Sequence, residues 1–138
     1  MYEYRVKIVK IVDGDTVDVD IDLGFGVWMH KERIRLFGID TPESRTRDLE
    51  EKKYGLAAKK FLTGMLDDEG GIILKTHKDK TGKFGRILGE LWRTTNYADQ
   101  SINNYMIDKH HAVMYLGQSK DDILEQHIKN RELVNLDE

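Results

Sequence analysis

Hydrophobic and polar residues alternate through much of the first third of the chain, which is the period of β-strands that bury one face. The clearest run spans residues 17–23, where every second residue is apolar and aspartates fill the three positions between them. Residues 6–12 alternate in a similar way. Residues 24–26, Gly-Phe-Gly, predict a turn, and residues 27–36 predict a returning strand that completes a hairpin.

The hydrophobic period changes from residue 54 onward. Apolar residues then recur every three or four positions as far as residue 65, with lysines between them, and this spacing predicts an amphipathic helix. We expect Gly70-Gly71 to stop that run. Residues 101–109 predict a second helix, and residues from about 121 to 136 predict a third helix with an uneven apolar stripe.

Two shorter apolar runs, residues 72–74 and 87–92, predict two more strands on either side of a basic, glycine-containing stretch. Strands followed by helices, without an internal repeat or a clear linker, are typical of a closed α+β fold. At 138 residues and 39% hydrophobic content, the chain suits one globular domain that spans residues 1–138.

Charge is distributed unevenly along the chain. The net charge of −3, taken alone, argues against a nucleic-acid partner. Residues 75–86, however, carry five basic side chains and one acidic side chain, whereas residues 89–138 carry five basic and nine acidic side chains. We therefore expect one face of the protein to meet phosphate while the other is solvated.

Residue usage limits the chemistry. Cysteine is absent, which excludes disulfides and thiolate chemistry, and the five histidines fit no zinc-ligand spacing, so any metal is expected to be held by oxygen. No apolar run is long enough to span a membrane, and the first residues lead directly into a strand pattern. As the chain stands, we expect a soluble, intracellular protein with no membrane partner; secretion of a longer precursor stays open.

Two turns that carry carboxylates flank a strand that carries arginines. The turns are residues 13–16, Asp-Gly-Asp-Thr, and residues 40–43, Asp-Thr-Pro-Glu; Arg-Ile-Arg-Leu at residues 33–36 lies between them, and Arg86 follows later. A lone Asp-Gly-Asp is more often a structural turn than a functional site, because Asp and Gly both favour turn geometry. Turn carboxylates also offer hard oxygen ligands to Ca²⁺ or Mg²⁺, and arginine presents a planar fork that matches phosphate oxygens. The second carboxylate turn beside arginines therefore predicts a site that cleaves phosphodiesters.

Five motifs stand in one order along the chain: DGDTV, RIRLFGIDTPE, KYGLAAKKF, KTGKFGRILGELW and NNYMIDKHHAVMY. In this order they resemble the staphylococcal-type, thermonuclease-like nucleases over roughly residues 5–130. The resemblance implies a five-stranded Greek-key β-barrel of the OB type packed with three α-helices. It also implies a monomeric, Ca²⁺-dependent endonuclease that hydrolyses DNA and RNA by attack of water on phosphorus and leaves 3′-phosphate ends.

The resemblance also implies a set of metal ligands. Asp15 and Asp40 would supply carboxylate oxygens to Ca²⁺, and Thr41 would supply its backbone carbonyl. Asp13 matches a neighbouring acid that acts through water or supports the ligands without touching the metal. Waters and the substrate phosphate would complete the coordination shell of Ca²⁺, which tolerates irregular geometry.

Three catalytic roles follow from the same resemblance. Glu43, which taken alone suits a turn or a helix N-terminus, becomes the general base or the group that orients the attacking water. Arg35 and Arg86, which taken alone suit an exposed strand, become the groups that stabilise charge on phosphorus and on the leaving oxygen. Arg33 has no role that the resemblance carries over, and we assign it to solvent or to substrate steering.

The substrate-binding positions match the family less evenly. Lys83 matches a lysine that faces phosphate, and Phe84 stands where the family usually has a tyrosine that contacts a terminal phosphate. Tyr115 corresponds to a tyrosine on which a base stacks, in a register that can slip by one residue. His110 replaces a glycine at the end of the second helix, so it must adopt left-handed geometry or end the helix differently.

Two other functions stay open at this point. A non-catalytic OB-type module could bind single-stranded nucleic acid on a groove with aromatic side chains. A small protein-interaction domain could use the acidic helical end, although no motif speaks for it. Intact acids at every matched catalytic position favour the enzyme over both alternatives.

Overall fold

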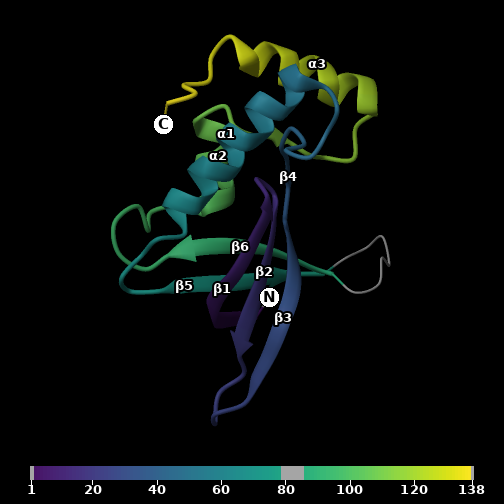
Figure 1. Cartoon of the computed structure of the whole chain (residues 1–138). Helices are drawn as coiled ribbons and strands as arrows, with labels where there is room; N and C mark the ends of the chain where they lie inside the picture. The colour runs from purple at the N-terminus through teal and green to yellow at the C-terminus, as the bar shows by residue number, and fades with distance from the viewer. Residues whose placement is uncertain (1, 79–85, 138) are drawn as a thin grey trace.

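Five strands form a closed barrel in the computed structural model, which describes residues 2–78 and 86–137 (Figure 1). The strands, in barrel order, are β1 (Glu3–Asp13), β2 (Thr16–Asp22), β3 (Trp28–Leu36), β6 (Ile87–Arg93) and β5 (Ile72–His77). Neighbouring strands are antiparallel except β3 and β6, which run parallel. With three helices packed at one end, this arrangement confirms the predicted α+β class and the five-stranded OB-type barrel.

The alternating pattern of β2 is the clearest link between sequence and barrel. Val17, Val19 and Ile21 are buried inside the barrel, and the three aspartates between and after them lie at its outer surface. At the tip of the β2–β3 hairpin, Gly24, Phe25 and Gly26 all have positive φ, which confirms the predicted turn. Both features were expected from period and turn chemistry alone.

Three helices, α1 (Leu49–Met65), α2 (Ile102–Asp108) and α3 (Lys120–Arg131), lie together at one end of the barrel in Figure 1. Asp48, Ser101 and Ser119 cap their N-termini by accepting backbone N–H bonds. The prediction that α1 starts at residue 54 was therefore five residues late, because the helix begins at its cap and not where the apolar period begins.

The ends of α2 and α3 test two further predictions. His110 follows α2 with φ of +63°, so the residue that replaces glycine does adopt left-handed geometry. The prediction that α3 extends to residue 136 was wrong, because the helix ends at Arg131 and the chain continues as turns. Leu133, which lies within the predicted span, is 62% exposed, so it adds no buried contact that would favour a longer helix.

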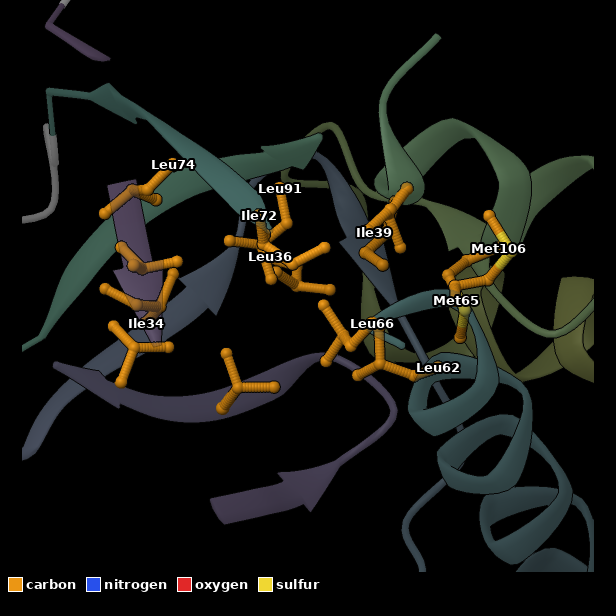
Figure 2. Close-up of a cluster of buried hydrophobic side chains, with 14 of the residues drawn as sticks. Ile34, Leu36, Ile39, Leu62, Met65, Leu66, Ile72, Leu74, Leu91 and Met106 are labelled. Atoms are coloured by element: carbon orange, nitrogen blue, oxygen red, sulfur yellow. The ribbon is translucent and has the colours of Figure 1, made fainter. Parts of the chain in front are cut away.

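The hydrophobic core is continuous from the barrel to the helices. Figure 2 shows it running from Ile34 and Leu74 on the strands to Met65 of α1 and Met106 of α2. All four side chains belong to one buried cluster. Because this cluster joins the helical layer to the mouth of the barrel, the loops at that end are held against a packed surface.

A small second sheet was not predicted. β4 (Ile39–Asp40) and β7 (Val113–Met114) pair antiparallel, with Ile39 opposite Met114 and Asp40 opposite Val113. Two residues are too few for a hydrophobic period, so sequence pattern could not reveal these strands. The pairing places the Asp40 turn next to the segment that leads into α3.

None of the helices within the described residues combines the length and the apolar character needed to cross a membrane.

Candidate active site

The turn between β1 and β2 is pressed against α1. A Cβ atom at Gly14 would lie 2.8 Å from Cβ of Ala58 and 3.1 Å from the side chain of Thr41. Such a contact is too short for any larger residue, so glycine is required here for close packing. The packing brings the Asp-Gly-Asp turn directly to the second carboxylate turn.

Asp15 connects the two turns. Its carboxylate accepts a hydrogen bond from the Thr41 backbone N–H at 3.1 Å and from the Thr16 hydroxyl at 2.9 Å. The residue is only 9% exposed. A buried carboxylate requires such donors, and here they direct it toward the residues of the Asp40 turn.

Arg35 lies between the two predicted metal-binding carboxylates. One of its nitrogens, Nη2, is 3.4 Å from Oδ2 of Asp15 and 3.5 Å from Oδ1 of Asp40. Its other terminal nitrogen donates to the carbonyl of Leu36 at 3.1 Å, which fixes the guanidinium plane. Two carboxylates that lie this close repel each other unless a positive charge stands between them, and here the Arg35 guanidinium supplies that charge.

Glu43 sits on a backbone that is held from two sides. Oδ1 of Asp13 accepts hydrogen bonds from the Ser44 backbone N–H at 3.2 Å and from the Ser44 hydroxyl. Helix α1 packs closely against the same backbone, since a Cβ atom at Gly55 would lie 2.3 Å from the Glu43 carbonyl oxygen. The Glu43 side chain itself is exposed and lines an open hollow with Asp13 and Arg45.

The donor set suits a hard cation. Asp15 and Asp40 offer carboxylate oxygens, and Thr41, whose backbone N–H binds Asp15, is the residue expected to offer its carbonyl. The buried Thr41 hydroxyl has no hydrogen-bond partner among the described residues. Within that part of the chain, no group of three or more histidine or acidic side chains is gathered for a metal ion. Oxygen ligands of this kind fit Ca²⁺ or Mg²⁺, with waters and substrate completing the shell.

The remaining predicted residues stand farther along the chain. Arg86 is half-buried and immediately precedes β6, whose Ile87 and Leu88 pair with Ile34 and Arg35. Tyr115 follows β7, is 43% exposed and donates its backbone N–H to the Gly38 carbonyl at 2.7 Å. Lys83 and Phe84 lie outside the described residues.

Sequence reasoning missed two polar contacts at this site. His127 of α3 places Nε2 2.8 Å from Oδ2 of Asp40, and Ser44 binds Asp13. His127 was considered only as a zinc ligand, and no spacing rule marks a histidine that contacts a carboxylate 87 residues away. Its position on a helix with a weak apolar stripe was the single available signal.

Comparisons with known proteins now add to this geometry. The sequence profile of the family described as "Staphylococcal nuclease homologue" matches residues 33–134. The chain is 33% identical to "Protein ParB" of Escherichia coli over 118 residues, which cover 82% of this chain and 58% of that protein. It is 34% identical to "Thermonuclease" of Staphylococcus intermedius over 89 residues, covering 64% and 48% respectively. "Thermonuclease" of Staphylococcus hyicus is 29% identical over 90 residues, covering 65% and 49%. The chain thus spans about half the length of these curated relatives.

Proposed function

We propose that this chain, which belongs to the staphylococcal nuclease homologue family, is a metal-dependent nuclease that hydrolyses phosphodiester bonds. The observation that carries the proposal is the convergence of Asp15 and Asp40 on one nitrogen of Arg35. Acids that could bind a cation and an arginine that could bind phosphate share one small volume, which is what this chemistry requires.

Asp15, Asp40 and the Thr41 carbonyl are the residues that would hold Ca²⁺. When bound, the ion would supply positive charge that polarises the phosphate and orients it. Asp13 would act differently, since its carboxylate binds Ser44 and so holds the backbone that carries Glu43. We therefore favour support of Glu43 over a water-mediated metal contact for Asp13.

Glu43 would accept a proton from the attacking water, or orient that water opposite the leaving oxygen. Its exposed side chain on a fixed backbone supports this role, because a base must reach solvent without losing its position. Arg35 and Arg86 would stabilise the charge that builds on the phosphate oxygens in the transition state. Lys83 would face a substrate phosphate.

The proposed substrates are DNA and RNA, with cleavage that leaves 3′-phosphate ends. Tyr115 would stack on a base, since it is exposed and follows β7, whose Val113 pairs with Asp40. Phe84 lacks the hydroxyl that the family usually places against a terminal phosphate, so ground-state binding would lose one hydrogen bond.

A gel assay with labelled single-stranded DNA and RNA tests the proposal. We expect cleavage with Ca²⁺, its loss in EDTA, and a loss of at least about 10²-fold in the Glu43→Gln variant. Glu69→Gln is the matched control, because Glu69 is also exposed but lies on the turn between α1 and β5. Cleavage that persists in EDTA would exclude the metal, and binding without cleavage would favour the OB-type binding module.

A further inference from the structure

Helix α3 buries a polar side chain and exposes apolar ones. His127 is its buried residue, whereas Leu124 and Ile128 are 50% and 49% exposed. A helix packed by the hydrophobic effect alone would show the opposite arrangement. The buried position of His127 therefore points to a specific partner, since buried polar groups are retained where they are hydrogen-bonded.

The partner of His127 is Asp40. Nε2 of His127 lies 2.8 Å from Oδ2 of Asp40, and His127 is 8% exposed. An ionised carboxylate accepts only, so the imidazole must donate its Nε2–H. The pairing of β4 with β7 brings these distant residues together, because it ties the Asp40 strand to the segment that precedes α3.

The two oxygens of Asp40 are held in different directions. Oδ2 is taken by His127, whereas Oδ1 lies 3.5 Å from the Arg35 nitrogen that also contacts Asp15. The histidine thus engages one oxygen and leaves the other on the side of Asp15. A carboxylate with both oxygens assigned has lost its rotational freedom before any ligand arrives.

We propose that His127 is a positioning residue that orients Asp40 for cation binding. The inference rests on the proposed function, because it takes Asp40 as a ligand of the metal. Groups that hydrogen-bond a metal ligand fix its orientation, and their removal typically weakens metal affinity by about 10- to 100-fold. α3 therefore contributes to the metal site without supplying a ligand.

A purely structural reading of His127 makes it an anchor that docks α3. Asn130 provides the matched control for that reading, since it lies nearly one helical turn away on the same helix. Its side-chain amide donates to the Ala112 carbonyl at 3.2 Å, so it also tethers α3 to the body of the protein. It is not bonded to Asp40 in any described contact.

Calorimetric titration of Ca²⁺ into the whole chain separates the two readings. We expect His127→Ala to raise the Kd for Ca²⁺ by about 10- to 100-fold. His127→Gln, whose amide N–H can still donate to Asp40, should recover most of the affinity. Asn130→Ala should change the Kd by less than about twofold, because its amide bonds the Ala112 carbonyl and not a proposed metal ligand. Circular dichroism checks that each variant is folded.

Two results would overturn the inference while leaving the metal site in place: an unchanged Kd in His127→Ala, or an equal loss of affinity in Asn130→Ala. If His127→Ala does not fold, His127→Leu replaces it, because leucine fills the buried position without a donor and carries the same expectation. Wild-type protein that binds no Ca²⁺ would remove the proposed metal site and the inference with it. Tight wild-type binding that His127→Ala retains would remove the inference alone.

Discussion

Two acidic regions of this molecule use their carboxylates in opposite ways. Asp68, in the turn after α1, accepts hydrogen bonds from the backbone N–H groups of Gly70, Thr94 and Thr95 at 2.9, 2.8 and 3.1 Å. The Thr95 hydroxyl donates to it as well. That hydroxyl, together with the backbone donors, holds the pKa of Asp68 well below its usual value against the opposing effect of burial.

At the other region, one oxygen of Asp15 and one oxygen of Asp40 lie near the same nitrogen of Arg35, and Glu43 stands exposed in the turn after Asp40. Backbone N–H groups and a hydroxyl bind the oxygens of Asp68, whereas Asp15 and Asp40 share one arginine nitrogen. A carboxylate held mainly by neutral donors is therefore read as structural, whereas two carboxylates that converge on one arginine mark a candidate site.

Substitution of Arg35, the residue that both carboxylates contact, is expected to have the largest effect on activity. Arg35→Lys keeps the positive charge but loses the planar fork, which contacts two carboxylates through Nη2 and is proposed to bind the substrate phosphate, so we expect kcat to fall by about 10²-fold or more. Arg86→Lys should fall similarly. Arg33→Lys, two residues away on the same strand, is the control and should stay near wild type. Normal kcat in the Arg35 and Arg86 variants would reject the electrostatic role.

Asp40→Asn tests whether the converging carboxylates bind the cation. Removing one of the two proposed carboxylate ligands should weaken Ca²⁺ affinity by about tenfold or more, and activity at limiting Ca²⁺ should fall with it. A calcium titration followed by calorimetry and by cleavage rate measures both quantities. If both titrations match wild type, Asp40 is not a ligand and the contrast with Asp68 loses its basis.

Asp68→Asn tests the structural side of the comparison. Because the folded-state pKa of Asp68 is lowered, its carboxylate stabilises the fold above its unfolded pKa, about 4, and this stability is lost as pH falls through the folded pKa. We expect the variant to melt several degrees below wild type at pH 7 and to converge with it in strong acid. Cleavage at 25 °C should be unchanged. A pH-independent difference in Tm would contradict the assigned cause.

The sequence predicted the elements whose signals are local and repeated. The alternation around Val17 and Val19 defines β2, and the two carboxylate turns meet because Thr16 pairs with Arg35 across β2 and β3. Once the hairpin register is set, that pairing brings the Asp15 turn to the strand that ends near Asp40. Much of the candidate site was therefore predictable from two motifs and one hairpin.

The parts that could not be predicted depend on single contacts between distant residues. β4 and β7 have two residues each, so their pairing leaves no period in the sequence. His127 reaches Asp40 only because that small sheet and α3 fold together, and a lone histidine carries no sign of its partner. α3 ends earlier than its apolar stripe predicts, and Leu133 beyond its end is exposed, so that stripe does not mark a buried face.

The smallest expected effect belongs to an ion pair outside both acidic regions. Arg33 binds Asp18 through Nε at 2.9 Å and Nη2 at 3.3 Å, and its hydrogen bond lowers the pKa of Asp18. Since Arg33 is about half exposed, Arg33→Ala should destabilise the fold by less than about 1 kcal/mol. Added salt should reduce that difference further because it screens exposed charges. Urea unfolding at low and high salt, with cleavage measured in parallel, checks both points. A large loss of activity with little change in stability would assign Arg33 to the substrate path, and the functional region would then extend along β3 beyond Arg35.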